Sequence, residues 1–381
     1  MLACEETPSV PAPSAPNAPV DAAAIARGEA LVARFECARC HAIEGVSPPD
    51  RAHDCVGCHL AIRNGTLEAT AEALARWQAR DIRLVDVPSL QHIGDRLEPS
   101  AIARFVRSPY DVRPDFAPTM PRLAITDREA EDIAAFLTRH AAARSVVPSG
   151  DVARGRERFD ALRCGRCHAY SGVVAAWPTP HESRLAPDLR HARERVRADR
   201  LAAWIRSPSS IEPGTAMPTT PMTEGDARDL AAFVLFAPLS PIPVPIVPTR
   251  LPILERRVTW AELETRIFRR VCWHCHGEPD YAHGDGGPGN TGGLGFPPRH
   301  VQLSSYAGAL SGEERDGERV SLFRPGPLGH PMLVDVLLLR QREEAGQPME
   351  GTRGMPLGLP SLTPEDVQLV ETWIAQGRPI E

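Results

Sequence analysis

Apolar residues recur at helical spacing in several parts of the chain, with polar residues between them. Thr363 followed by Pro364 marks the start of the last such stretch, because proline is favoured at the first helical position. The pattern therefore predicts a mainly α fold. The positions that carry the spacing are Ala30, Leu31 and Phe35, then Phe159 and Leu162, then residues 260–271, and finally Val367, Val370, Trp373 and Ile374.

Two Pro-rich segments interrupt this pattern. Residues 1–25 are rich in Pro and Ala and show no periodicity, which predicts an extended tether. Residues 238–252 are also Pro-rich, but the Ile and Val among them predict that this linker lies along a surface. We therefore expect folded parts at residues 26–237 and 253–381.

The first of these parts contains an internal repeat. Short sequences recur in the same order, which divides it into two copies at residues 26–141 and 150–237. The matching pairs are Arg27-Gly28 with Arg154-Gly155, Pro88 to His92 with Pro187 to His191, Phe105 to Pro109 with Trp204 to Pro208, Met120-Pro121 with Met217-Pro218, and Ile133 to Leu137 with Leu230 to Val234.

Eight of the nine cysteines lie in four copies of the pattern Cys-x-x-Cys-His, the attachment signature of c-type haem. Two thiols one helical turn apart reach two vinyl groups of one porphyrin, and the next residue places an imidazole beneath the iron. The sequence thus predicts four covalent haem c groups, each with a proximal histidine. The motifs are Cys37-Ala-Arg-Cys40-His41, Cys55-Val-Gly-Cys58-His59, Cys164-Gly-Arg-Cys167-His168 and Cys272-Trp-His-Cys275-His276.

Paired cysteines have three other common uses. The 14 residues between Cys40 and Cys55 are close to zinc-ribbon spacing. Redox-active pairs and structural disulfides also use Cys-x-x-Cys. None of these uses needs a histidine directly after the second cysteine, so attached haem is the favoured interpretation.

The motif at Cys55 lies in an insertion. The first copy has 47 residues from His41 to Pro88, whereas the second has 19 from His168 to Pro187. The difference of 28 residues contains this motif, so the first copy is expected to carry two haems.

The pattern of an N-terminal helix, Cys-x-x-Cys-His, a later Met-Pro and a final amphipathic helix resembles class I cytochrome c. Both copies match it over their whole length, and residues 253–381 resemble related cytochrome c domains. The resemblance implies three tandem helical domains joined by Pro-rich linkers. The first is a dihaem domain, and the other two carry one haem each.

The resemblance also implies axial ligation by histidine and methionine. Met120, Met217 and Met355 each precede a proline and would face the haems of His41, His168 and His276. Core filling is the alternative role of a methionine. Met222 competes with Met217, and Met349 is a weaker rival of Met355.

No methionine of this kind is left for the inserted haem at His59. Its sixth ligand could be His53, His92 or His140, or the position could be open. A haem with two histidine ligands would have a lower potential than the His/Met haems.

The ninth cysteine, Cys4, follows Leu2-Ala3 and precedes the Pro-rich tether, which resembles the end of a bacterial lipoprotein signal. The charged and apolar regions expected upstream are missing, so the true N-terminus could lie further upstream; an ordinary thiol is the alternative. Haem attachment in this family takes place outside the cytoplasm. The resemblance therefore implies the bacterial periplasm or outer surface, with membrane association through a lipid at Cys4.

Charge and ligation narrow the function. The 43 basic residues are all arginine and the net charge is −6, which argues against nucleic-acid binding. Saturated His/Met sites favour an electron carrier, rather than an enzyme, working between a donor and an acceptor protein. A haem enzyme acting at the inserted haem, such as a peroxidase or small-molecule reductase, is the alternative. A third interpretation is a cytochrome subunit of a larger respiratory complex.

Overall fold

The computed structural model describes residues 21–50, 53–79, 87–110, 112–113, 120–170, 185–241, 245–277 and 292–381. This part of the chain is mainly helical, with one short hairpin, which confirms the predicted fold class. Among the helices described, none has the length and apolar character needed to cross a membrane. Cys4 and most of the predicted tether lie outside the described residues.

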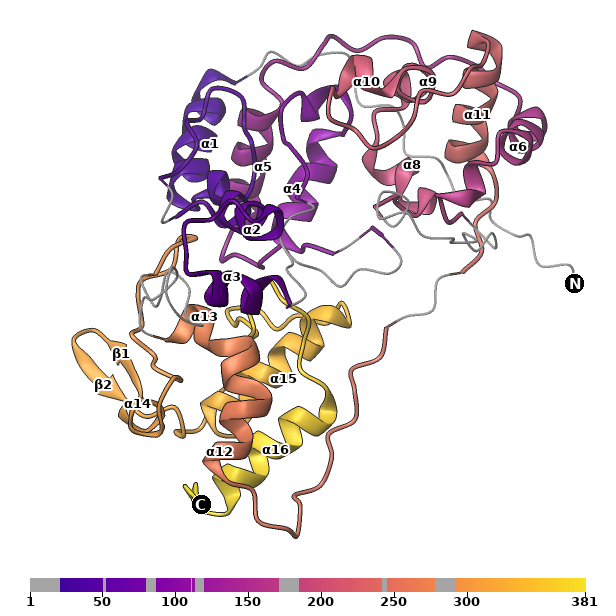
Figure 1. Ribbon diagram of the computed structural model, residues 1–381. Helices are drawn as coiled ribbons and strands as arrows, with labels where there is room; N and C mark the ends of the chain where they lie inside the picture. Colours follow the sequence, from indigo (N-terminus) through magenta and orange to yellow (C-terminus); the bar gives the residue numbers. More distant parts are fainter. Residues whose placement is uncertain are drawn as a thin grey trace, which may run out of the picture.

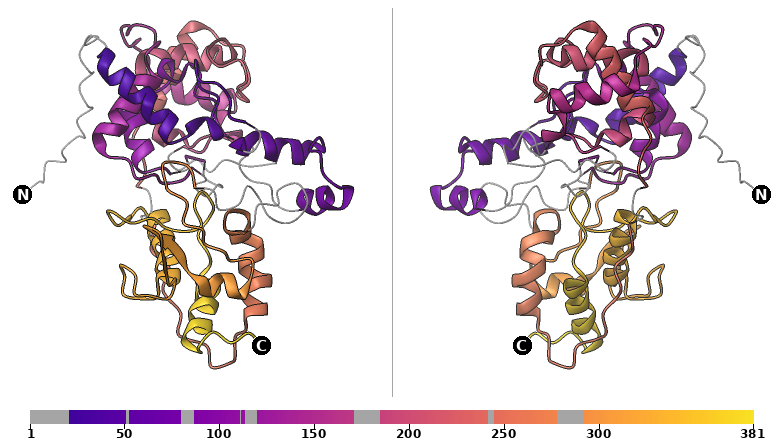
Figure 2. Two further views of the ribbon diagram at one scale, coloured as in Figure 1. Left: turned by 90° about the vertical axis from the view of Figure 1, so that its left-hand side faces the viewer. Right: turned by 90° about the vertical axis from the view of Figure 1, so that its right-hand side faces the viewer.

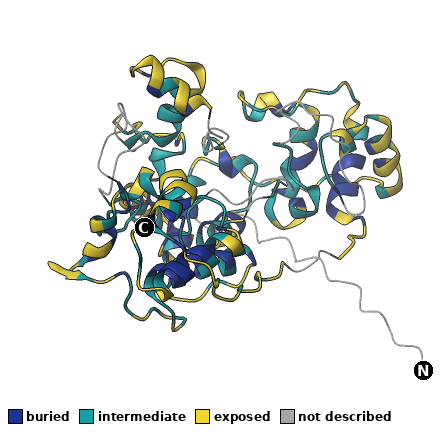
Figure 3. Cartoon of the chain, turned by 60° about the horizontal axis from the view of Figure 1, so that its bottom comes forward, coloured by how far each residue is buried: buried dark blue, intermediate teal, exposed yellow. Residues whose placement is uncertain are grey.

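The two copies of the repeat lie side by side, with residues 253–381 on the other side of the molecule (Figure 1). Buried side chains of the described residues gather into three large hydrophobic clusters, one in each copy and one in residues 253–381. Figure 3 shows these buried positions on the inner faces of the helices, with exposed residues on the outer faces.

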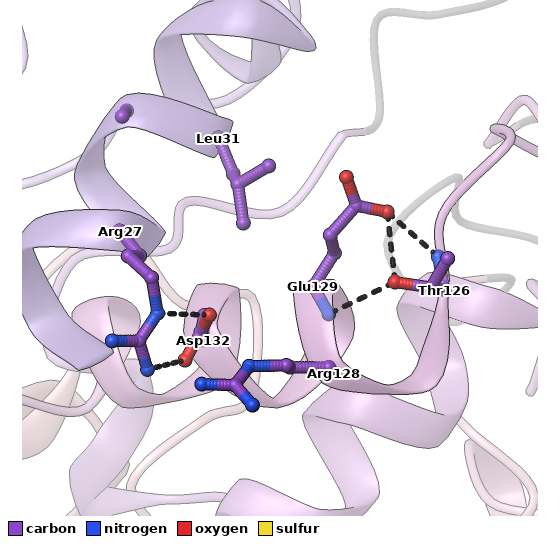
Figure 4. Close-up of a pocket in the computed structure, with 7 residues that line it drawn as sticks. Arg27, Leu31, Thr126, Arg128, Glu129 and Asp132 are labelled. Carbon is purple, nitrogen blue, oxygen red and sulfur yellow. Dashed lines mark hydrogen bonds and ion pairs between the residues drawn. The ribbon is translucent and has the colours of Figure 1, made fainter.

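The first copy is built around the crossing of two helices, α1 and α5. They meet at Gly28, where a Cβ atom would lie 2.0 Å from the carbonyl oxygen of Asp132, so only glycine fits. Beside this contact, Arg27 donates two hydrogen bonds of 2.7 and 2.8 Å to the Asp132 carboxylate (Figure 4). The Arg27 guanidinium holds the pKa of Asp132 below its usual value. The helices are α1 (Ala22–Arg34), α4 (Pro99–Arg107) and α5 (Asp127–Leu137).

The second copy repeats this arrangement. Here α6 crosses α11 at Gly155, where a Cβ atom would lie 2.0 Å from the carbonyl oxygen of Asp229. Arg154 donates hydrogen bonds of 3.0 and 3.3 Å to the Asp229 carboxylate. The helices are α6 (Val152–Ala161), α8 (Ala192–Arg195), α9 (Ala198–Arg206), α10 (Pro208–Ile211) and α11 (Glu224–Phe236).

The copies contact each other through equivalent residues. Leu97 forms an antiparallel bridge with Val196, which occupies the same position in the second copy. Two hydrogen bonds of 2.8 Å flank the bridge in opposite directions, from the amide of Glu98 to the carbonyl of Arg195 and from the amide of Arg197 to the carbonyl of Arg96. The copies are therefore related by an approximate two-fold axis between Leu97 and Val196.

Arginine stacking follows the same symmetry. Arg195 lies over the ring of Phe105 at 4.9 Å, and Arg96 lies over the ring of Trp204 at 5.6 Å. Each pair joins one copy to the other, so the same contact occurs twice in the interface, once from each copy.

The insertion forms a small unit of its own. Its helices are α2 (Cys55–Asn64) and α3 (Ala71–Gln78), which pack through a separate cluster of Leu67, Ala73 and Trp77. Figure 2 shows them projecting from one side of the molecule, at the level where the repeats and residues 253–381 meet. The insertion thus lies beside the junction of the two parts of the fold.

Residues 253–381 form a second helical assembly. The predicted helix at residues 260–271 is present, with a π-helical stretch in its second half, and the last helix begins at Pro364 with Thr363 as its cap, as predicted. The elements are α12 (Trp260–Leu263), a π-helix (Glu264–Cys272), α13 (Trp273–His276), α14 (Tyr306–Ser311), the antiparallel strands β1 (Glu313–Arg315) and β2 (Glu318–Val320), α15 (Met332–Glu344) and α16 (Pro364–Ala375).

The end of the Pro-rich stretch at 238–252 is held on α16. Arg250 pairs with Glu371, and the carbonyl of Pro252 accepts a hydrogen bond of 2.6 Å from Gln368. Ile246 remains 86% exposed, so its side chain covers little surface.

Candidate haem sites

The motifs at Cys37 and Cys164 share one backbone geometry. In each, the residue before the first cysteine is left-handed, with φ of 50° at Glu36 and 57° at Arg163. A 3-10 turn follows, and the amide of the motif histidine donates a hydrogen bond of 3.0 Å to the carbonyl of the first cysteine. The two motifs therefore fold into the same backbone turn.

The motif histidines of these two sites are also held alike. Nδ1 of His41 donates a hydrogen bond of 2.8 Å to the carbonyl of Pro88, and Nδ1 of His168 donates one of 2.9 Å to the carbonyl of Pro187. Burial lowers the pKa of both imidazoles, which favours the neutral form that binds metal. Each ring is thus oriented by its Nδ1, and Nε2 is left to act as a ligand.

The insertion leaves this arrangement unchanged. The hydrogen bond spans 47 residues in the first copy and 19 in the second, yet its length is nearly the same. A neighbouring backbone hydrogen bond of 2.9 Å is repeated as well. The amide of Leu90 donates to the carbonyl of Ala42, and the amide of Leu189 donates to the carbonyl of Ala169. The insertion therefore adds to the first site without altering its support.

The other two motifs are helical. Helix α2 begins at Cys55, and the side chain of Asp54 caps it by accepting a hydrogen bond of 2.7 Å from the amide of Gly57. The motif at Cys272 instead lies where a helix ends, with His276 as the last residue of α13. Burial lowers the pKa of His276 to about 4. The backbone of Val301 acts in the opposite direction and raises this pKa, but by less.

All eight described cysteines are free thiols. Burial raises the pKa of Cys37 to about 11 and that of Cys272 to about 12, so both are protonated at neutral pH. The first cysteine of three motifs and the second cysteine of the inserted one pack against the hydrophobic clusters. These are Cys37, Cys164, Cys272 and Cys58. Of the other four, Cys275 is exposed and Cys40, Cys55 and Cys167 are half-buried.

Three of the four motifs converge. The Cys40 thiol donates a hydrogen bond to the sulfur of Cys55, which lowers the pKa of Cys55. Cys275 is close enough to Cys55 for the two to interact electrostatically, and the cation of Arg39 acts on both. The charged groups that act on Cys164 are instead Cys167 and Asp160, both in the second copy. The structure thus gathers three candidate sites around Arg39.

Contacts between the two parts of the fold support this convergence. The amide of Leu294 donates a hydrogen bond of 2.6 Å to Glu36, whose carboxylate also pairs with Arg39 at 3.0 Å. Arg122, two residues after Met120, lies 3.6 Å from Glu343 of α15. The first copy is therefore joined to residues 253–381 at two places, through Glu36 and through Arg122.

One histidine that the sequence analysis did not consider lies at this meeting point. The rings of His59 and His274 have centroids 5.9 Å apart, with planes inclined by 55°. His274 occupies the second variable position of its own motif. The sequence signal was this extra histidine between two motif cysteines, but only the fold places it beside His59.

The predicted methionine ligands are half-buried, and none belongs to the described hydrophobic clusters. Arg353, two residues before Met355, is close enough to His276 to affect its pKa, so the Met-Pro segment lies near that motif. Met222 packs against the hydrophobic cluster of the second copy, which gives it a core role. Met349 is 36% exposed. Ligation by Met120, Met217 and Met355 remains a prediction.

Of the histidines suggested for the inserted site, His53 lies beside the start of α2, where its carbonyl is 4.0 Å from the sulfur of Cys55. His53 has a side chain 40% exposed and pairs with Asp50 at 3.7 Å. His92 and His140 are both exposed.

Within the described ranges, no group of three or more His, Cys, Asp or Glu side chains is arranged to hold a metal ion. Compared with protein-family models, curated proteins and solved structures, the chain matches none.

Proposed function

We propose that the chain is a tetrahaem c-type cytochrome that transfers single electrons between redox partner proteins. In this proposal residues 26–141 form a dihaem domain, and residues 150–237 and 253–381 form monohaem domains. Haem iron, when attached, supplies one-electron chemistry. The chain's own residues bind it, fix its ligands and set the distances between sites.

The thiols and imidazoles suit this role. Two of the motifs share one backbone turn, and their histidines are oriented through Nδ1, with burial lowering the pKa of both imidazoles and so favouring the neutral form. Arg39 is 12% exposed, and its Nε is buried without a hydrogen-bond partner among the described residues. A buried cation with an unused donor fits the carboxylate groups that a haem carries.

The convergence of three motifs is the observation that carries the proposal. Electron transfer within one chain needs its redox groups close together, and the rings of His59 and His274, from two of these motifs, lie 5.9 Å apart. The electrostatic effects among Cys40, Cys55 and Cys275 agree with this and include the motif of the first copy. The motif at Cys164 belongs to the other copy, on the far side of the two-fold interface. We therefore propose a group of three haems with rapid exchange and a fourth that exchanges separately.

We place the protein in the bacterial periplasm or on the outer surface, because the proposed haem attachment takes place outside the cytoplasm. Membrane association would come from a lipid at Cys4. An unmodified Cys4 thiol in the mass spectrum of native protein would exclude the lipid and leave the electron-transfer role intact.

Two double variants test the grouping. We expect Cys164→Ala/Cys167→Ala to retain fast redistribution of an electron after flash photoreduction, because the three grouped sites remain. Cys272→Ala/Cys275→Ala should lose one component of that redistribution. The two variants are matched because each removes one haem, and measurement of the haem content of each protein verifies this. Redistribution that slows in proportion to protein dilution in all variants would contradict the proposal, since it would show transfer between molecules only.

A further inference from the structure

The inserted motif has a proximal histidine, His59, but no Met-Pro segment to supply a second axial ligand. We propose that His274, which lies across from His59 in the motif at Cys272, is the sixth ligand of the iron bound there. The inference rests on the proposed haem at Cys55 and Cys58. It assigns that site two histidine ligands from different parts of the fold.

The separation of the two rings fits this role. Their centroids are 5.9 Å apart. A metal–imidazole bond is about 2 Å long and the ring centre lies about 1 Å further, so two imidazoles on opposite sides of one metal have centres roughly 6 Å apart. The two rings therefore already stand at the spacing that shared ligation requires.

The helices direct the side chains appropriately. On α2, Cys55, Cys58 and His59 are spaced by three and four residues and share one face. In the other motif, Cys272 and His276 are four residues apart, and His274 is halfway between them on the opposite side of the helix. His274 therefore points away from the haem of its own motif.

The surroundings bring these faces together. The ring contact of His59 with His274 joins α2 to α13, and burial together with the nearby Cys55 raises the pKa of Cys275, the residue after His274. His274 is exposed, so its imidazole is accessible to a group attached at α2. His53 is instead engaged with Asp50 beside the helix start.

This ligation has two consequences. It would tie the insertion to residues 253–381 through the iron, which gives the position of α2 and α3 beside this junction a function. It would also give the inserted site a lower potential than the His/Met sites, because thioether ligation raises the potential of haem iron.

Carbon monoxide binding to the reduced protein tests the ligand. Wild-type protein, with its sites saturated, should bind none, whereas reduced His274→Ala should bind about one equivalent per chain. In the oxidised state the same variant should show one high-spin ferric haem in its electron paramagnetic resonance spectrum. His274→Met should restore the six-coordinate state and raise the potential of that haem. The control variants His53→Ala, His92→Ala and His140→Ala should behave as wild type.

The inference is overturned if His274→Ala carries four low-spin haems and binds no carbon monoxide, or if one of the control variants opens the site instead. Haem content of the peptide that contains Cys55 and Cys58 separates the two proposals. Absence of haem from this peptide in the wild type would refute the tetrahaem assignment itself.

Discussion

Replacing Arg197 with methionine is expected to lower the free energy of unfolding by about 3–5 kcal/mol, because it removes one partner of a buried ion pair. The Arg197 side chain is 3% exposed and that of Asp199, its partner at 2.7 Å, is 4% exposed. Arg197 also donates hydrogen bonds to the carbonyls of Gly94 and Ala142 at 3.2 and 2.7 Å. The variant would leave the buried Asp199 carboxylate without its cation, although Ser145 still donates to it, and would remove the donor to the carbonyls of Gly94, Ala142 and Ala143.

Chemical denaturation monitored by circular dichroism measures this effect. Arg156→Met is the matched control. The side chains of Arg156 and of its partner Asp160 are 51% and 59% exposed, so this ion pair should contribute no more than about 1 kcal/mol to the free energy of unfolding. Arg197→Lys retains the positive charge but lacks the planar guanidinium group. Its loss of stability should therefore lie between those of Arg197→Met and Arg156→Met. An Arg197→Met protein as stable as the control would show that the interface between the copies does not depend on this arginine.

Replacing Gly155 with valine is expected to destabilise the second copy by about 1–3 kcal/mol, because the crossing of α6 and α11 has no space for a side chain. Its Cβ atom would lie 2.0 Å from the carbonyl oxygen of Asp229 and 2.7 Å from the Cβ of Phe233. The helices would have to separate, which would also loosen the turn that carries Cys164.

Melting temperature and haem content together measure this effect. Gly214→Ala is the control, because a Cβ atom at Gly214 would have nothing within 4 Å. We expect the Gly155 variant to mature with less haem attached at Cys164 and Cys167 than at any other site. Equally reduced attachment at all four sites, or no loss of stability, would contradict the independence of the second copy.

The sequence was sufficient for features that depend on local pattern. The four motifs, the repeat and the insertion follow from spacing along the chain, and the helix start at Pro364 follows from its cap. The repeat also marked Pro88 and Pro187 as equivalent, but their role as acceptors for His41 and His168 required the fold. A carbonyl group leaves no signature in residue identity.

The meeting of distant motifs could not be predicted from pattern. Cys275 is 220 residues from Cys55, and their proximity depends on how the insertion docks beside the junction of the two parts of the fold. The same docking sets His274 opposite His59. The predicted roles of Met120, Met217 and Met355 rest on their Met-Pro context and are open to spectroscopic test.

Intact mass combined with a pyridine haemochrome assay tests the central claim most directly. The eight cysteines of the four motifs predict four haem c groups per chain, each attached through two thioether bonds, so that none of these thiols reacts with an alkylating reagent. Fewer than four haems in protein matured in a host competent for haem attachment, or motif cysteines found as disulfides or zinc ligands, would contradict the account.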